Sequence, residues 1–295
     1  MITYSEIFHS IQGEGHYTGR PTAWLRYFLC NLQCNGFGQS DPTNPSTYKL
    51  PYEDINVDDY KSMDELPVFE FGCDSSYSWA KKFKKLAYQN TAEEIANNIR
   101  FNIKSDQNEC GAFNFNDTKT HMCFTGGEPL MKHAQKATPE IMQVFFDQND
   151  WPKYITFETN GTQALTEDFK DSLDDWRYEG GIETFFSVSP KLWTVAGEKA
   201  SKAIKPDVVA EYSDFGPGQL KFVCNGRPEA WDEIEVVTKQ FRSAGVDYPV
   251  WIMPVGATVE GQKLCDGDVA REAFKRGYNV SARVHTYLWG NIIGV

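Results

Sequence analysis

No stretch of 18 or more consecutive apolar residues occurs in the 295-residue chain, so no segment is expected to span a membrane. The N-terminal segment MITYSEIFHSIQGEG lacks the basic and apolar regions of a secretory signal peptide and leads directly into structured sequence. Internal repeats and low-complexity tracts are also lacking. We therefore expect a cytoplasmic protein without membrane partners.

Positive charge is scarce. The chain has 29 Lys and Arg against 41 Asp and Glu, which gives a net charge of −12. This balance argues against broad contact with a nucleic-acid backbone, so no direct nucleic-acid partner is expected. The local exception is KKFKK at Lys81 to Lys85, which is typical of a solvated helix face.

A disulfide framework is not expected either. The seven cysteines are odd in number, the chain is long, and no secretory signal is present. An isolated cysteine such as Cys123, within the apolar run HMCFT, is most often a small core residue.

From Thr120 onward, strand-like and helix-like segments alternate. The predicted strands are short and rich in β-branched and aromatic residues: HMCFTGG, YITFETNG, TFFSVSP, QLKFVCN, VWIMPVG and NVSARVHTYLW. An amphipathic helix is predicted from Arg227 to Gly245, and a capping box of Thr91 and Glu94 predicts another. A further helix is predicted with Pro139 at its first position.

Repeated β–α units imply a parallel sheet with right-handed crossovers. With about seven units, a full or partial (β/α) barrel is the natural closure, and an open doubly wound sheet is the alternative. Both arrangements place chemistry at the carboxyl ends of the strands. We expect one α/β domain over residues 1–295.

The segment from Asn35 to Gly72 interrupts this rhythm. It holds four prolines, eight acidic residues and only two lysines in 38 residues. Long loops of this kind in compact domains are usually functional or disordered. The segment is therefore predicted to be an acidic, Pro-rich insertion.

Cys30 and Cys34 directly follow WLRYFL, a predicted strand, and Cys73 lies in a comparable setting within FEFGCDSSYSW. Thiolates are soft ligands that select zinc, Cu(I) or iron–sulfur clusters. Three thiolates with an open position suit a catalytic centre, whereas a structural zinc site needs a fourth ligand. The spacing of the cysteines alone does not decide between a catalytic centre with three thiolates and a zinc site with a fourth ligand.

A second signal is FTGGEP, Phe124 to Pro129, at the end of a predicted strand. Two glycines let the backbone approach a ligand closely, and Glu128 could accept hydrogen bonds from an ammonium group. A plain strand-to-helix turn is the alternative for this motif taken by itself.

Together these residues resemble the radical S-adenosylmethionine superfamily, in which three cysteines hold a [4Fe–4S] cluster within a modified, partial (β/α) barrel. The blocks SIQGEGHYTGRPTAWLR, CDS, TGGEP, FETNGT, SVSPKL and VHTYLW, in this order, resemble the 7-carboxy-7-deazaguanine synthase family. The resemblance covers nearly the whole chain apart from residues 35–72 and the region around Cys110.

The resemblance implies a lyase of 7-deazapurine biosynthesis, on the queuosine pathway. Such an enzyme converts 6-carboxy-5,6,7,8-tetrahydropterin to 7-carboxy-7-deazaguanine and releases ammonia. The cofactors implied are the cluster, S-adenosyl-L-methionine and Mg²⁺. The partners implied are the pterin, an electron donor such as a flavodoxin, and a second copy of the chain in a homodimer.

The site residues carried over by the resemblance fall into three groups. Cys30, Cys34 and Cys73 correspond to the cluster ligands, and Ser75 to the magnesium position, where the family normally has threonine. The substrate contacts implied are Gln12, Gly13, Glu14, Arg26, Thr125 and His285. The cofactor contacts implied are Asp74, Gly126, Gly127, Glu128, Ser189, Pro190, Lys191, Met253 and Pro254.

Two departures from the family pattern stand out. The third cysteine follows the second after 38 intervening residues, and Gly72 precedes it where the family has an aromatic residue that touches adenine. Phe71 and Phe37 are the candidate replacements. The departures lead to the hypothesis of a divergent, phage-encoded branch acting in the host cytoplasm, whose product serves either tRNA or DNA modification.

Two other functions compete with the synthase. A glycyl-radical activating enzyme would share the cysteines, but QGEG, SPK and HTY suit a small-molecule pocket better than a protein substrate. A zinc-stabilised, non-enzymatic binding module would leave TGGEP, ETNGT and SPK unexplained.

Overall fold

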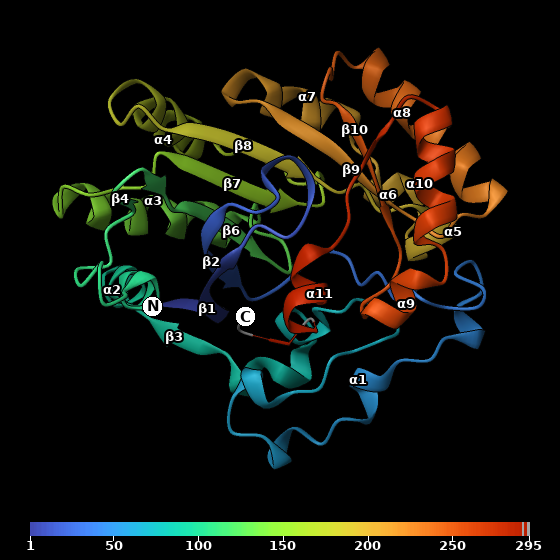
Figure 1. Cartoon of the computed structure of the whole chain (residues 1–295), viewed down its shortest axis with the longest axis horizontal. Helices are drawn as coiled ribbons and strands as arrows, with labels where there is room; N and C mark the ends of the chain where they lie inside the picture. The colour runs from blue at the N-terminus through green and yellow to red at the C-terminus, as the bar shows by residue number, and fades with distance from the viewer. Residues whose placement is uncertain (291, 294–295) are drawn as a thin grey trace.

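The computed structural model describes residues 1–290 and 292–293 and is built around one curved sheet of nine strands (Figure 1). The strands are β1 (Ile2–Ile11), β2 (Pro21–Tyr27), β3 (Tyr88–Asn90), β6 (His121–Gly126), β7 (Tyr154–Thr159), β8 (Glu183–Val188), β9 (Gly218–Cys224), β10 (Val250–Pro254) and β11 (Asn279–Val280). A separate hairpin pairs β4 (Asn114–Phe115) with β5 (Thr118–Lys119).

The strand order decides between the two predicted architectures. Neighbouring strands run β11-β10-β9-β8-β7-β6-β2-β1-β3, and every pair from β2 to β11 is parallel. Only β1 pairs antiparallel, with β2 and β3. A doubly wound sheet would reverse its order at a switch point. The continuous order instead confirms a partial (β/α) barrel.

Most of the helices connect successive strands and pack on the outer side of the sheet, whereas the C-terminal helix follows the last strand and contributes His285 to the interior (Figure 1). They are α2 (Ala92–Ile103), α3 (Lys132–Asp147), α4 (Glu167–Tyr178), α5 (Trp193–Ala196), α6 (Ala200–Ala203), α7 (Pro206–Phe215), α8 (Pro228–Ser243), α9 (Val259–Lys263), α10 (Asp266–Lys275) and α11 (Val284–Trp289). None of the described helices is both long enough and apolar enough to cross a bilayer.

Alternation along the strands separates the core from the barrel interior. On β9, Leu220 and Phe222 join the main hydrophobic cluster, while Lys221 lines an interior cavity. On β7, Phe157 faces the same cluster and Glu158 faces the cavity. Because successive strand side chains point to opposite faces, the polar residue between two core residues must face inward.

Two predicted helices are found with adjusted ends. The capping box of Thr91 and Glu94 is present at the start of α2. Pro139, however, lies inside α3 and not at its first position. The helix begins earlier because buried side chains fix its first turns: Gln135 donates to the Leu130 carbonyl at 2.6 Å and Thr138 to the Ala134 carbonyl at 2.8 Å.

The prediction of a strand through NVSARVHTYLW is wrong beyond Val280. Only β11 pairs with the sheet, and the VHTYLW portion forms helix α11. The backbone leaves the sheet because Arg283 turns inward to carboxylates, and the Val284 N–H donates to the Gly13 carbonyl at 2.9 Å.

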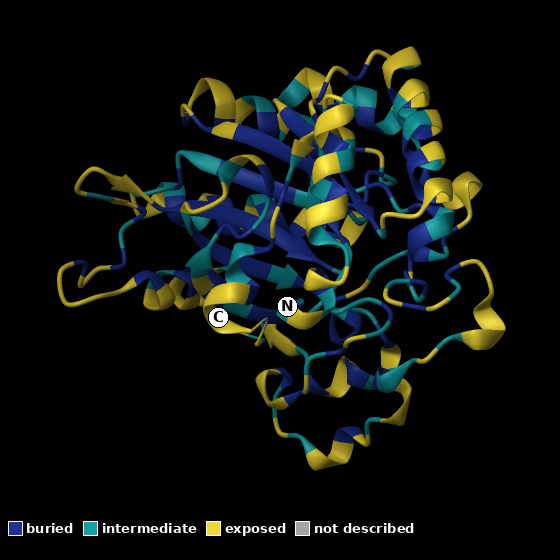
Figure 2. Ribbon diagram, turned by 45° about the vertical axis from the view of Figure 1, so that its right-hand side comes forward, coloured by how far each residue is buried: buried dark blue, intermediate teal, exposed yellow. Residues whose placement is uncertain are grey.

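The acidic segment 35–72 contains α1 (Pro51–Asp54) and short 3₁₀ turns at Pro45–Thr47, Val57–Asp59 and Met63–Glu65. Figure 1 shows it at the lower edge of the molecule, and Figure 2 shows its exposed turns around a small buried interior. That interior is a second hydrophobic cluster to which Phe69 contributes, together with Phe28 after β2 and Phe83. The segment therefore shares its core with the barrel's edge.

The lysines of the basic run KKFKK are exposed or half-exposed, as predicted, but the run is not part of an α-helix. It forms a 3₁₀ turn, Lys81–Leu86, whose Phe83 is fully buried. Lys85 pairs with Asp58, and Lys82 donates to the Glu53 carbonyl at 2.6 Å. The basic run thus provides cationic partners and hydrogen-bond donors to the acidic segment.

Candidate functional site

One cavity of about 280 Å³ lies inside the curved sheet at the carboxyl ends of the parallel strands. Most of the residues singled out in the sequence line it. These are Gln12, Gly13, Glu14, Arg26, Cys30, Cys34, Cys73, Asp74, Ser75, Thr125, Gly126, Gly127, Ser189, Lys191, Met253, Pro254 and His285. Segments that are far apart in the chain therefore meet at one site.

Glu128 and Pro190 are the two predicted contacts that do not line the cavity. The Glu128 carboxylate is fully buried and accepts bonds from the Leu130 N–H at 3.0 Å, the Thr159 hydroxyl at 2.7 Å and the Asn160 N–H at 2.7 Å. Its oxygens are therefore engaged by the chain. Glu128 joins the end of β6 to the end of β7 rather than offering a free carboxylate to an ammonium group.

The three cysteines of the predicted ligand set converge. Cys34 packs with Leu32 and Ala196 in a small apolar cluster, against which Cys30 and Cys73 also lie. Among the described residues, no group of three or more His, Cys, Asp or Glu side chains is placed to hold a single metal ion. The three thiols therefore lie together at one wall of the cavity.

Hydrogen-bond donors point at these sulfurs. The Leu32 N–H donates to Cys30 Sγ at 3.4 Å and Asn160 Nδ2 does so at 3.9 Å. The Cys73 and Ser75 side chains lie 3.4 Å apart, sulfur to oxygen. Such donors stabilise the thiolate form that cluster ligation requires.

Trp79 lines the same cavity beside Cys73. Its indole N–H is buried and has no hydrogen-bond acceptor among the described residues. Burial and the Asp74 charge raise the pKa of the Cys73 thiol, and the polar side chains of Ser75 and Trp79 oppose that rise. An N–H without an acceptor beside a thiol marks a place where a charged sulfur is expected.

Phe37 is the aromatic residue beside the cysteines, and it packs against the same small apolar cluster. It lines the cavity, and the Lys191 ammonium lies 5.7 Å from its ring centroid. Phe71 is not among the cavity-lining residues and instead lies under Lys49, at 5.3 Å from Nζ to the ring centroid. Of the two candidates for the missing aromatic, only Phe37 faces the site.

The QGEG loop crosses the barrel interior. Its ends are joined by the Gln12 N–H, which donates to the Arg20 carbonyl at 2.7 Å. Gly13 approaches His285 so closely that a Cβ there would lie 1.9 Å from Nδ1. Only glycine fits at this position, which explains the first glycine of the motif. His285 thus belongs to the site as a helix residue, and burial lowers its pKa.

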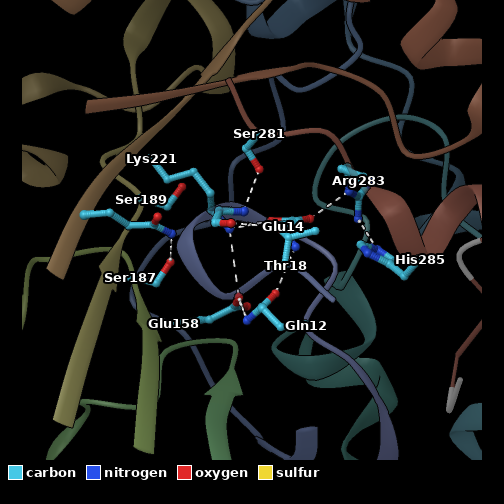
Figure 3. A network of polar contacts seen from close by, with 12 residues as sticks. Gln12, Glu14, Thr18, Glu158, Ser187, Ser189, Lys221, Ser281, Arg283 and His285 are labelled. Carbon is cyan, nitrogen blue, oxygen red and sulfur yellow. Dashed lines mark hydrogen bonds and ion pairs between the residues drawn. The ribbon is translucent and has the colours of Figure 1, made fainter. Parts of the chain in front are cut away.

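Glu14 is the centre of a buried charge network (Figure 3). Lys221 from β9 pairs with one carboxylate oxygen, and Arg283 Nε donates to the other at 2.9 Å. Arg283 also donates to Asp74 at 2.8 Å, and Lys221 Nζ lies 3.9 Å from Glu158. We call these five residues the Glu14 network.

The network holds its charges in place despite burial. Burial alone would raise the pKa of Glu14, but Lys221 and Arg283 lower it well below its usual range. Burial likewise disfavours the Lys221 cation, yet the charges of Glu14 and Glu158 raise its pKa. The carboxylate next to the cavity is therefore ionised and fixed in orientation.

A pH experiment tests this electrostatic coupling. The pKa of Glu14 is lowered from 4.5 in the folded protein, so its stabilising contribution is present above that value and lost as the pH falls below it. We expect wild-type protein to lose stability more steeply than Glu14→Gln as the pH falls below about 5, and to show the same pH dependence as that variant between about pH 7 and pH 5. Urea unfolding at several pH values measures the difference, and parallel pH profiles would contradict the expectation.

Arg26 is more constrained than the sequence suggests. Its Nε pairs with Glu6, which also accepts the Tyr77 hydroxyl at 2.8 Å, and its Nη1 donates to the Gly126 carbonyl at 3.3 Å. Only Nη2 lacks an acceptor among the described residues. The Nε–H and one Nη1 N–H are engaged, so the three remaining N–H groups, one on Nη1 and two on Nη2, are left for a carboxylate.

The sequence reasoning missed Lys221, Arg283, Glu158 and Trp79. Lys221 and Glu158 had a usable signal, because Lys221 lies between two apolar residues of a predicted strand and Glu158 directly follows Phe157 in another, so alternation directs both to the opposite face. Arg283 and Trp79 had none, since their positions depend on how the C-terminal segment and the turn after Cys73 fold back.

The fold and site together define a partial-barrel α/β protein whose interior cavity is lined by three cysteines and a buried charge network. No protein-family model matches the chain. The curated 7-carboxy-7-deazaguanine synthase of Pyrobaculum aerophilum is 22% identical over 290 residues, covering 98% of this chain and 95% of the relative. The protein of the same name from Halobacterium salinarum is 25% identical over 309 residues, covering 98% and 91%.

A shorter match has a higher sequence identity. The 7-carboxy-7-deazaguanine synthase of Bacteroides thetaiotaomicron is 52% identical over 35 residues, which cover 12% of this chain and 19% of the relative. Among solved structures, the crystal structure of QueE from Escherichia coli matches with a TM-score of 0.48 and 16% identity over 96% of this chain and 94% of that one. The chain is a divergent homologue of proteins named 7-carboxy-7-deazaguanine synthase, which confirms the resemblance drawn from its motifs.

Proposed function

We propose that this chain is a 7-carboxy-7-deazaguanine synthase that converts 6-carboxy-5,6,7,8-tetrahydropterin to 7-carboxy-7-deazaguanine with loss of ammonia. Full-length homology to proteins of that name supports an enzyme of the radical S-adenosylmethionine type. The observation that carries the proposal is the meeting of Cys30, Cys34 and Cys73 with the QGEG loop in one cavity.

Three thiols with aligned donors and one aromatic wall fit a [4Fe–4S] cluster and S-adenosylmethionine. Cys30, Cys34 and Cys73 would hold the cluster, and Gly126, Gly127, Ser189 and Lys191 would contact the cofactor, together with Asp74, Met253 and Pro254. When bound, the pair supplies a radical that removes hydrogen from the substrate. Phe37 would bound the adenine, because it is the candidate aromatic that faces the cavity.

The substrate end of the cavity is the charge network. The ionised Glu14 and Gln12 would receive the donor edge of the pterin, and the free Nη2 of Arg26 would meet its carboxylate. Thr125 and His285 would close the pocket beside them. Because Lys221 and Arg283 hold Glu14 in one orientation, this end binds and orients the pterin without rearranging charge.

Ser75 is proposed as the protein ligand of Mg²⁺. Its hydroxyl is a hard oxygen donor at the cavity wall, and substrate oxygens and waters would complete the coordination. A homodimer, an external electron donor and a lyase reaction remain parts of the same proposal, as does one domain over residues 1–295 with the acidic insertion at 35–72.

The reaction itself tests the function. Protein purified without oxygen should be brown and hold about four irons per chain. Incubation with the carboxy-tetrahydropterin, a reductant, S-adenosylmethionine and Mg²⁺ should then yield the deazaguanine acid. A colourless protein with one zinc would favour the binding module, and an iron-loaded protein that forms no product would favour an activating enzyme.

Trp79→Phe should lower the reduction potential of the cluster and slow turnover about tenfold. The variant keeps an aromatic ring but removes the N–H beside Cys73. A hydrogen bond to a ligand sulfur favours the reduced, more negative cluster, so its loss makes reduction harder. Redox titration followed by electron paramagnetic resonance measures the potential, and an unchanged value would show that the indole N–H does not reach the sulfur.

A further inference from the structure

The loop that carries Cys30 and Cys34 has an unusual backbone. Leu29 and Cys34 both adopt positive φ angles, of 97° and 54°. L-residues rarely occupy this left-handed region, so the surrounding structure must hold them there. The first of these residues is fixed by its neighbours, since Leu29 donates to the Ser78 carbonyl at 2.8 Å and accepts from the Glu128 N–H at 2.8 Å.

Glu198 holds the second. Its Oε1 accepts the Gln33 N–H at 2.7 Å and the Cys34 N–H at 2.9 Å. The side chain comes from the segment after α5, and only 8% of the residue is exposed. A carboxylate that accepts two backbone N–H groups forms strong, charge-assisted bonds.

The contact around Glu198 extends along the same segment. The Gly36 N–H donates to the Ala196 carbonyl at 3.0 Å, and a Cβ on Gly36 would lie 2.6 Å from the Ala196 carbonyl carbon. Ala203 of α6 packs against Cys34 from the same side. The cysteine loop is therefore docked on residues 196–203, which Glu198 joins to it by its side chain.

Glu198 also places a negative charge next to the cysteines, and this charge raises the pKa of the Cys34 thiol in addition to burial. Its only cationic partner within 4 Å among the described residues is Lys202, at 3.7 Å from Oε2. The Lys202 side chain is 52% exposed, so solvent screens it far more than it screens Glu198. The Lys191 ammonium opposes Glu198 at Cys34, but it is the same in the wild type and in a Glu198 variant, so the contribution of the Glu198 charge can be measured separately.

We propose that Glu198 is a positioning residue that fixes the Cys30–Cys34 loop and, through its charge, lowers the reduction potential of the cluster held there. The redox part rests on the proposed function. A nearby anion disfavours the addition of an electron, and cluster potentials respond to such charges. The Lys202 cation raises the reduction potential, by less than the Glu198 carboxylate lowers it.

Three variants separate position from charge. Glu198→Gln keeps an oxygen that accepts the two N–H groups but removes the charge, so the iron content should stay near wild type while the potential rises. Lys202→Gln should shift the potential the other way, by less. Glu198→Ala removes the acceptor as well, so its iron content should fall by about half or more and the Gln33 and Cys34 amides should exchange hydrogen about tenfold faster.

Asp150→Asn is the matched control. Asp150 also accepts a backbone N–H, from Phe113 at 3.1 Å, and pairs with Arg100 at 2.7 Å, but it precedes β7 at the opposite end of the strands. The Asp150→Asn variant should be less stable than the wild type, but its reduction potential and the hydrogen exchange of its cysteine loop should be unchanged. A reduction potential in Glu198→Gln equal to that of the wild type would overturn the proposal. So would an iron content and a hydrogen-exchange rate in Glu198→Ala that equal those of the wild type.

Failure of the proposed function gives a different result. A wild-type protein that binds no iron would overturn the synthase and the redox role of Glu198 together. Hydrogen exchange of the wild type and of Glu198→Ala can also be compared in iron-free protein. This comparison therefore tests the positioning role whether or not the protein binds iron.

Discussion

Cys73→Ala is expected to abolish product formation and most of the iron-dependent colour, while the chain still folds. In the sequence 38 residues separate Cys34 from Cys73, yet both cysteines line the same cavity. If Cys73 is the third thiolate, its loss leaves two ligands, too few to hold a cluster of the proposed type. Iron content, visible absorbance and product formation under anaerobic conditions measure the effect.

Cys110→Ala serves as the control for that experiment. Cys110 is exposed and lies outside the cavity, so its variant should keep iron, colour and activity. Circular dichroism checks that both variants keep their secondary structure. If Cys73→Ala retained iron and product at the level of Cys110→Ala, the third ligand would have to be sought elsewhere.

Lys221→Met is expected to destabilise the fold by about 3 kcal/mol, near the lower end of the cost of breaking a buried ion pair. The methionine keeps the stem volume, but Glu14 loses one of its two cations and Glu158 loses its only cationic neighbour within 4 Å among the described residues. Urea unfolding at neutral pH measures the change. The pterin should also bind more weakly, which a rise in KM would show.

A double variant identifies the cause. Lys221→Met combined with Glu14→Gln removes both charges, so part of the lost stability should return, with a coupling of about 1–3 kcal/mol. Lys275→Met is a suitable control, because Lys275 is an exposed lysine in a surface pair with Glu272 and should cost little. A Lys221→Met variant as stable as Lys275→Met would show that the buried cation is not needed.

Much of the fold could be predicted because it depends on local pattern. The strands from β6 to β10 follow short apolar runs with turn residues at their ends, and the repeated β–α order implies a parallel sheet. The strand after Asn279 could not be predicted correctly. VHTYLW has strand-forming residues, but contacts of Arg283 and Val284 with the QGEG loop draw the backbone into a helix.

The residues predicted for the site were those that belong to short contiguous motifs. Such motifs name Cys30, Cys34, Gly127 and Lys191 directly, and all four line the cavity. Glu128 shows the limit of motif reasoning, because its carboxylate turns away from the cavity to bond β7. A motif identifies a residue type at a position but not the direction of its side chain.

The sequence by itself determined the cysteine set, the β–α order and the glycines of QGEG, because these depend on residue identity and spacing along the chain. The tertiary structure decided which charges meet. Glu14, Lys221 and Arg283 are separated by up to 269 positions, and their pairing exists only once the barrel has closed around the loop. The same holds for Glu198 and Cys34, which are 164 positions apart. Ion pairs and side-chain hydrogen bonds to the backbone form between residues that are close in space, and they produce no periodic pattern in the sequence.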